Sequence, residues 1–160
     1  MKKRSITLMR AISITLALVL CLALLPACGA SSDDEGQVTV VISADGVTNE
    51  YVVDIGEVEI TEGALSVLKY LEIKEGLEIV MTDGIYGAYL TKVGIAEADD
   101  ATGAYVAIYT NVEADFDVSA YATTIEYEGI SLTSSGLGIS LMTVKDGGVI
   151  YICEEVYSFS

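Results

Sequence analysis

The sequence predicts an α+β domain in which one helix packs on a mainly antiparallel sheet. From Gln37 onward, short runs of alternating apolar and polar residues recur, most of them bounded by glycine, aspartate or asparagine. A single segment, residues 62–74, carries apolar residues near helical spacing. Many strands with one helix are typical of a sheet that this helix covers on one face.

The first two runs, residues 37–43 and 50–55, predict a β-hairpin. They read "QVTVVIS" and "EYVVDI", so apolar side chains recur at every second position over much of each run. The segment between them contains Asp45, Gly46 and Asn49, which are residues that favour turns.

The helix is predicted over residues 62–74. Thr61 is placed to cap its amino terminus, and Glu62 favours its first turn. Gly76 is expected to end it. The apolar residues near helical spacing are Leu65, Leu68 and Leu71.

Further strands are predicted along the rest of the chain, and "KDGG", residues 145–148, predicts a hairpin turn between the last two. The order of two strands, one helix and a series of strands indicates a β-grasp-like arrangement. The predicted strands are residues 77–82, 88–95, 104–110, 123–128, 138–144 and 149–156.

The amino terminus has the pattern of a secretory signal peptide. Residues 1–10 carry four positive charges and no negative ones, and an apolar run follows from Ala11 to Ala27. At about 17 residues the run is at the lower limit for spanning a bilayer, so length alone leaves a single-span anchor open.

The end of this run, "LPAC", resembles the lipobox of bacterial lipoproteins through Leu25, Ala27 and Cys28. The resemblance implies cleavage after residue 27 and lipidation of the Cys28 thiol. A chance cysteine in an uncleaved anchor is the alternative. The chain then divides into a signal peptide (1–27), a lipidated cysteine with a polar tether (28–36) and a folded domain (37–160). The acyl chains attached to Cys28 would hold the domain on the extracytoplasmic face of the cell membrane.

The charge of the expected mature chain excludes one class of partner. Without residues 1–27 the chain keeps four lysines against all 24 acidic residues, a formal charge of −20. Such a field repels phosphate backbones, so nucleic acid is not expected as a partner. The chain is nevertheless rich in apolar residues and is expected to bury a core.

The side chains that most enzymes and metal sites use are scarce. The chain contains no histidine, and after lipidation Cys153 is the last cysteine, expected to lie inert in the core. The acidic segments 97–100 and 113–117 lack EF-hand spacing and are expected to be solvated. We therefore expect no enzyme activity, cofactor or metal site, although an enzyme working through carboxylates alone and calcium binding by these carboxylates stay open.

Several segments resemble the transcobalamin-like carboxy-terminal domain family, recorded mainly as a domain of unknown function. They are "TVVISADGVTNEYVVDI", "YGAYLTKV", "GAYVAIYTN" and the turn "KDGGVI", within residues 37–155. The resemblance implies a β-grasp-like fold and, in the namesake vitamin carriers, a domain that closes over one face of cobalamin beside a large helical domain. This sequence departs from the family in leaving no room for that helical partner and in lacking the tryptophan that relatives often carry in the strand 104–110.

The ten tyrosines supply the candidate site. Tyrosine suits half-buried sheet surfaces, so these rings either fill the sheet or form an aromatic platform with hydroxyl tips that grips a ligand. Tyr105 and Tyr109 are expected on one side of their strand, as are Tyr121 and Tyr127 if their strand is continuous. The candidate ligand-binding residues are Tyr86, Tyr89, Tyr105, Tyr109 and Asn111.

The sequence therefore predicts a membrane-anchored extracytoplasmic binding module. Its expected partners are the membrane, through Cys28, and a small molecule or a surface protein, with cobalamin or another corrinoid as the named ligand. The alternative is a cell-surface structural or protein–protein interaction module that has no small-molecule pocket and uses a sheet edge for strand addition.

Overall fold

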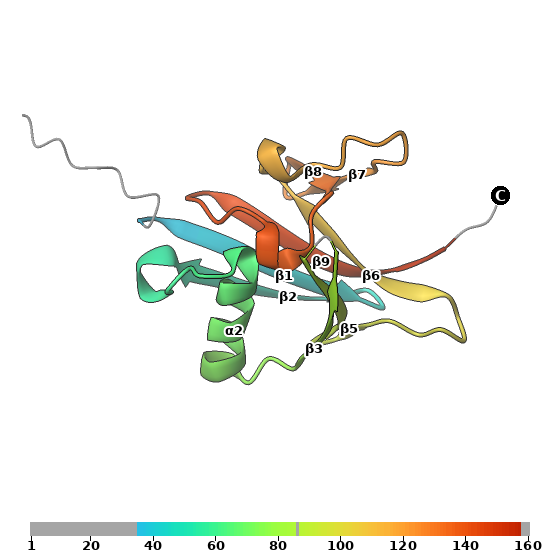
Figure 1. Ribbon diagram of the computed structural model, residues 1–160, viewed down its shortest axis with the longest axis horizontal. Coiled ribbons are helices and arrows are strands. Elements are labelled where there is room, and N and C mark those ends of the chain that lie inside the picture. Colours follow the sequence, from blue (N-terminus) through green and yellow to red (C-terminus); the bar gives the residue numbers. More distant parts are fainter. Residues whose placement is uncertain (1–34, 86, 158–160) are drawn as a thin grey trace, which may run out of the picture. The chain divides into compact units, whose positions relative to one another are not determined.

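The computed structural model describes residues 35–85 and 87–157 (Figure 1). Within them, a larger sheet has the strand order β2-β1-β9-β6-β8-β7 and a smaller sheet the order β3-β4-β5. The α-helix α2 packs on the larger sheet. The strands of the larger sheet are β1 (Gln37–Ala44), β2 (Val47–Asp54), β6 (Ala104–Thr110), β7 (Thr124–Tyr127), β8 (Ile130–Ser134) and β9 (Gly148–Val156).

The predicted opening hairpin is confirmed, with a tighter turn than expected. Strands β1 and β2 pair antiparallel up to Ala44 and Val47, so Asn49 lies inside β2. The two residues between the strands, Asp45 and Gly46, both have positive φ, 52° and 77°. Two left-handed residues in sequence make the turn whose twist matches that of paired strands.

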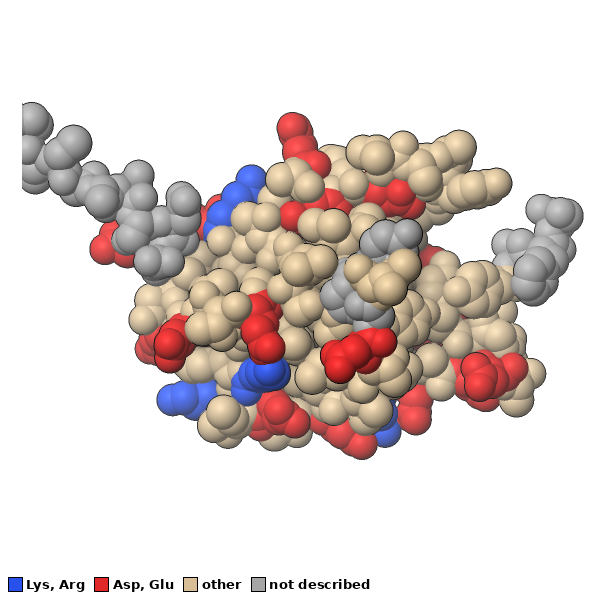
Figure 2. Space-filling view, viewed as in Figure 1, with Lys and Arg blue, Asp and Glu red and all other residues tan. Residues whose placement is uncertain are grey.

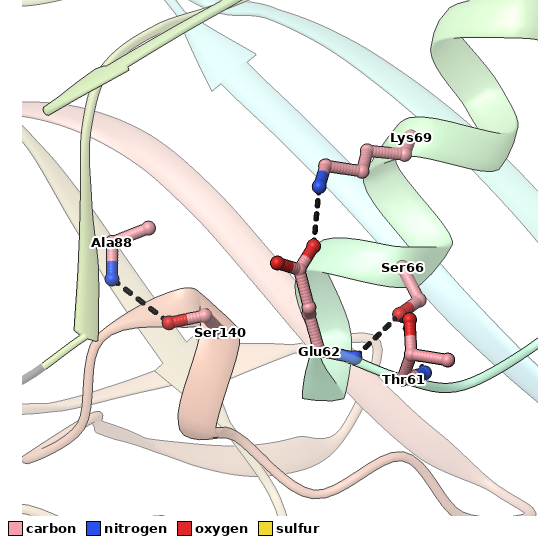
Figure 3. Close-up of polar contacts among 6 residues, drawn as sticks. All are labelled: Thr61, Glu62, Ser66, Lys69, Ala88 and Ser140. Carbon is pink, nitrogen blue, oxygen red and sulfur yellow. Dashed lines mark hydrogen bonds and ion pairs between the residues drawn. The ribbon is translucent and has the colours of Figure 1, made fainter. Parts of the chain in front are cut away.

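Helix α2 (Gly63–Glu75) begins differently from the prediction and ends as predicted. Thr61 does not cap it; instead the Ser66 hydroxyl accepts hydrogen bonds from the backbone N–H groups of Thr61 at 3.1 Å and Glu62 at 2.9 Å (Figure 3). At the other end Gly76 adopts the left-handed conformation, φ 70°. The predicted leucines of this helix are buried.

The core forms on both faces of the larger sheet because successive side chains of a strand point to opposite sides. Val40 and Ile42 of β1 belong to the cluster that includes the α2 leucines. Val41, between them, belongs to the second cluster with Tyr109 and Leu132. In Figure 1, α2 lies on one side of strands β1, β9 and β6, and the β7–β8 end of the sheet lies on the other side of these strands.

The predicted α+β class is confirmed, and a specific β-grasp fold is not. Strand β9 runs parallel to β1 and antiparallel to β6, so the larger sheet is mixed. The smaller sheet is antiparallel and contains β3 (Ile79–Gly84), β4 (Gly87–Val93) and β5 (Ala96–Glu97). Short 3-10 turns lie at Ile55–Glu57 (η1), Glu113–Asp115 (η2) and Ile139–Leu141 (η3).

The predicted strand at 138–144 is wrong. Ile139 and Met142 are buried while Leu141 is exposed, because the segment contains the turn η3 and packs against the start of α2. The Met142 carbonyl accepts a hydrogen bond from the backbone N–H of Ala64 at 3.1 Å. Consequently "KDGG" forms a turn that leads into β9 and does not join a hairpin.

The strand β8 was not predicted. It pairs antiparallel with β7 across Glu128 and Gly129, which both have positive φ, 49° and 79°. Glutamate is rarely found in this conformation, so the local sequence gave a weak turn signal. Alternation and common turn residues therefore do not predict this short hairpin.

The amino-terminal predictions lie outside the described residues. They include the signal peptide 1–27, lipidation at Cys28 and all but the last residues of the tether, as well as Tyr86 further along. In the described ranges, no helix combines the length and apolarity that a bilayer crossing needs. The membrane anchor thus stays a prediction.

Candidate ligand-binding cleft

A cleft of about 650 Å³ lies where the two sheets meet. One side is made by the β3–β4 hairpin and the floor by β6. The other side is made by residues of the loop before β7 and of the segment 134–138. Among the described residues, the tyrosines that line it are Tyr89, Tyr105, Tyr109, Tyr121 and Tyr157.

The floor exists because β6 is only partly paired along one edge. Strand β8 pairs with β6 through Tyr109 and Thr110, and the backbone N–H of Ser135 adds a hydrogen bond to the Ile108 carbonyl at 2.8 Å. The edge of β6 before Ile108 faces the cleft, and its amino-terminal end is closed by a bridge between Asp99 and Ala104. The cleft therefore opens along the part of β6 that does not pair with β8.

Glu155 joins two of the tyrosines. It lies opposite Tyr105 in the β6–β9 register, and the Tyr105 hydroxyl donates to its Oε2 at 2.6 Å. The Tyr109 hydroxyl donates to its Oε1 and lies 2.9 Å from the Thr123 Oγ1. Tyr109 is 2% exposed, so this end of the cleft is rigidly packed.

The environment keeps both hydroxyls protonated. Burial, and then the hydrogen bond to Glu155, raise the pKa of Tyr105 well above the usual tyrosine value. The same causes raise the pKa of Tyr109 to about 12. Near neutral pH both phenols therefore act as hydrogen-bond donors to the carboxylate.

A second group of rings lies nearer the mouth. Tyr157 stacks on Tyr105 with ring centroids 4.3 Å apart and an interplanar angle of 23°. Burial, and then Tyr157, raise the pKa of Tyr89. Tyr121 lies on the other side of the cleft and is 89% exposed. The cleft thus offers both packed and accessible aromatic faces.

Backbone contacts hold the walls in place. The N–H of Ala88 in β4 donates to the Ser140 hydroxyl at 2.8 Å, which fastens the β3–β4 wall to η3 (Figure 3). On the other side Gly136 lies close to Asp117, where a Cβ at residue 136 would meet the Asp117 Cα at 3.1 Å. Glycine therefore permits the close approach of these two segments.

The structure brings together three of the five candidate site residues, Tyr89, Tyr105 and Tyr109. Tyr86 lies outside the described residues. Asn111 does not line the cleft: its Oδ1 accepts from the Val149 N–H at 2.8 Å, and its Nδ2 donates to the Gly147 carbonyl at 2.9 Å. Its amide ties the end of β6 to the start of β9.

The other predicted tyrosine pair does not form. Strand β7 begins at Thr124, so Tyr121 precedes it and reaches the cleft. Tyr127 instead donates to Glu50 and packs against Tyr151 with ring centroids 5.3 Å apart. The strand was assumed to be continuous from Tyr121 to Tyr127. Because Tyr121 lies in a loop before β7, strand alternation does not place the two rings on one face.

The surroundings of the acidic side chains and of the cysteine thiol suit a structural role. In the described part of the chain, no three His, Cys, Asp or Glu side chains converge on a possible metal site. Asp115 is buried, and its carboxylate accepts from the Thr143 N–H at 2.7 Å and hydroxyl at 2.9 Å. Cys153 is half-buried, and burial raises the pKa of its thiol to about 12, which disfavours the reactive thiolate.

Acidic side chains are spread over the face of the molecule in Figure 2, and lysines are few. Asp83, Asp117 and Glu155 line the cleft, and within the described residues no lysine or arginine does. Lys92 contacts Glu78 and Glu97, each at 3.1 Å, outside the lining.

These features define an α+β module with a tyrosine-lined, acidic cleft, and comparison with known proteins supports the fold. No family model matches the chain, and no curated protein matches it. Solved structures resemble it, among them two at low sequence identity. One is a protein from Ruminococcus gnavus ATCC 29149, provisionally described as metal binding, with 18% identity and a TM-score of 0.52 over 78% of this chain and 100% of that one.

The other is haptocorrin in complex with Cbi, with 15% identity and a TM-score of 0.53. The match covers 77% of this chain but only 25% of haptocorrin, so the chain corresponds to about a quarter of that protein. At such identities the likeness concerns the fold. It supports the coarser part of the family resemblance, a distant transcobalamin-like fold.

Proposed function

We propose that this chain is a membrane-anchored extracytoplasmic lipoprotein that binds a small molecule in the tyrosine-lined cleft. The observation that carries the proposal is the cleft itself, which five tyrosines of the described residues line together with Glu155, the partner of Tyr105. Aromatic faces with polar tips, around a few fixed polar groups, are typical of sites that orient a small ligand. The proposal includes no catalytic step.

A corrinoid is the ligand that we name. Its macrocycle is flat, which suits stacking on tyrosine rings, and its rim carries amide groups that hydroxyls and carboxylates can bind. The likeness to haptocorrin, solved with the corrinoid Cbi (cobinamide), supports this choice. An open cleft of about 650 Å³ would hold part of such a molecule and leave the rest for solvent or a partner.

The anchor rests on the sequence. The lipobox-like "LPAC" and the tether that follows support an anchored domain outside the membrane, within reach of ligands. A surface-tethered module of this kind would collect its ligand at the cell envelope. The strongly acidic domain would also keep neighbouring copies apart.

The direct test is a calorimetric titration of the detergent-extracted protein with cobinamide and with cobalamin. We expect saturable binding of at least one of them, weakened by Tyr105→Ala. Tyr70→Ala is the matched control, because Tyr70 donates to Glu57 at the edge of α2 and does not line the cleft. Absence of binding would refute a corrinoid as the ligand, and equal loss in both variants would refute the cleft as its site.

The alternative is a structural or interaction module. Strands β2 and β7 form the outer edges of the larger sheet, and such edges can pair with a strand of another protein. This function needs no cleft. Failure of every small-molecule titration, together with capture of a partner that backbone changes in β2 or β7 abolish, would favour it.

A further inference from the structure

The described residues that line the cleft concentrate negative charge and include no cation to balance it. Three carboxylates line it, Asp83, Asp117 and Glu155, and no lysine or arginine among the described residues does. The ion pairs of the described residues lie elsewhere: Lys69 contacts Glu62, and Lys92 contacts Glu78 and Glu97. A ligand in the cleft would therefore meet carboxylates whose negative charge no described lysine or arginine balances.

Glu155 is held in position by two tyrosine hydroxyls. Each of its oxygens accepts one phenol, Tyr105 on Oε2 and Tyr109 on Oε1. A carboxylate offers about four acceptor positions, so roughly two remain for a ligand. Because the phenols hold the group in place, a ligand that binds it gains a preorganised partner.

Aromatic faces lie beside this carboxylate. Tyr157 stacks on Tyr105, which holds Glu155, and Tyr89 and Tyr121 line the same cleft. A cation over a tyrosine ring is attracted by the negative face of the ring, and more strongly when water is excluded. Tyrosine rings around a fixed carboxylate suit a ligand that has a positively charged centre and an apolar surface around it.

Other ligand charges fit poorly. An anion would approach a domain whose expected mature form has a formal charge of −20. A neutral apolar ligand would cover Glu155 and remove its water without replacing it, which is costly. A cationic ligand avoids both penalties.

We propose that the ligand of the cleft presents a positively charged centre on an apolar body to the Glu155 carboxylate. This inference rests on the proposed function and names the class of ligand. Two sources share this chemistry: a corrinoid whose cobalt centre carries net positive charge, and an organic ammonium compound.

The test compares ligands that differ in charge and share their shape. Aquocyanocobinamide is cationic and dicyanocobinamide is neutral on the same macrocycle. Phenyltrimethylammonium is cationic and tert-butylbenzene is its neutral counterpart. Affinities are measured with the detergent-extracted protein. In at least one pair we expect the cation to bind about tenfold more tightly or better, equal to about 1.4 kcal/mol.

Two variants locate the effect. Glu155→Gln keeps the shape and removes the charge, and it should abolish the preference for the cation. Glu50→Gln is the matched control, because Glu50 also accepts a tyrosine hydroxyl, from Tyr127, and lies outside the cleft lining. Thermal unfolding of both variants checks the fold, and the wild-type comparison of cation with neutral ligand needs no variant.

The outcomes separate the two proposals. Equal binding of cationic and neutral members, or a preference that survives in Glu155→Gln, overturns this inference and leaves the proposed small-molecule function standing. A preference in the ammonium pair alone supports the inference and removes corrinoid as its source. Absence of binding by all four probes overturns the corrinoid proposal and the inference together.

Discussion

Tyr105 and Glu155 lie directly opposite each other on β6 and β9, and the tyrosine hydroxyl donates to the carboxylate at 2.6 Å. Tyr109, on the same face of β6, donates to the other carboxylate oxygen. The strand register thus places two phenols on one acid at the end of a cleft. Because these bonds are partly buried and lie in the proposed ligand site, they give the first predictions.

Replacing Tyr109 with phenylalanine should destabilise the domain. The change removes the buried hydroxyl that contacts Glu155 and Thr123, which we expect to cost about 1–2 kcal/mol in the free energy of unfolding. Urea denaturation measures it. The control Tyr127→Phe removes a more exposed bond to Glu50 and should cost about 0.5 kcal/mol or less. Equal costs would contradict the buried network.

Alkaline pH should weaken the fold through the same tyrosines. In the unfolded chain a tyrosine loses its proton near pH 10, whereas in the folded protein the pKa of Tyr109 is about 12. The unfolded state therefore binds fewer protons between these values, and stability falls as the pH rises from about 10 to about 12. Denaturation at a series of pH values should show this fall, and Tyr109→Phe should flatten it. A wild-type slope unchanged by the substitution would be the contrary result.

Asn111→Ala should reduce stability without weakening ligand binding. It leaves the Val149 N–H and the Gly147 carbonyl without their side-chain partner, at a cost of about 1–3 kcal/mol. Asn111→Asp keeps the acceptor for Val149 and should lie in between. Loss of affinity in a folded Asn111→Ala protein would show that the amide acts in recognition after all.

Gly63→Ala should be more harmful than Gly76→Ala. Both residues have positive φ, 50° and 70°, so both changes strain the backbone. At residue 63 the new Cβ would also lie 2.5 Å from the Met142 carbonyl oxygen, whereas at residue 76 nothing lies within 4 Å. We expect a difference of at least about 1 kcal/mol in thermal or urea unfolding. Similar values would mean that α2 does not pack tightly on residues 140–142.

Cys28→Ser should prevent processing and lipid attachment. The protein should then retain residues 1–27 and no longer incorporate labelled fatty acid. Cys21→Ser is the control, because Cys21 lies inside the expected signal peptide and its loss should leave processing intact. Mass spectrometry of the membrane fraction distinguishes the forms. A lipidated Cys28→Ser protein would exclude the lipobox.

The sequence predicted the elements that depend on local patterns. Alternation and a turn at Asp45 and Gly46 identified the first hairpin, and leucine spacing with Gly76 identified α2. The strand predicted at 138–144 was wrong because the apolar residues of this segment pack against the helix and do not belong to a paired strand. No local signal separates these two uses of apolar residues.

The cleft was only partly predictable for a similar reason. Tyr105 and Tyr109 share a face because of strand periodicity alone. Glu155 is 50 residues from Tyr105 in sequence, and their pairing depends on the β6–β9 register. Tyr157 follows β9 and joins the cleft through the same strand. Once β6 and β9 are known to pair, alternation along β9 places Glu155 beside the tyrosines.

We propose that a small molecule binds in this cleft, and an NMR titration with cobinamide checks this residue by residue. With tyrosine rings isotopically labelled, we expect saturable shifts of the Tyr105, Tyr109 and Tyr157 signals and unchanged signals of Tyr51 and Tyr70, which do not line the cleft. Saturable shifts confined to tyrosines outside the cleft, or no shifts at all, would contradict it.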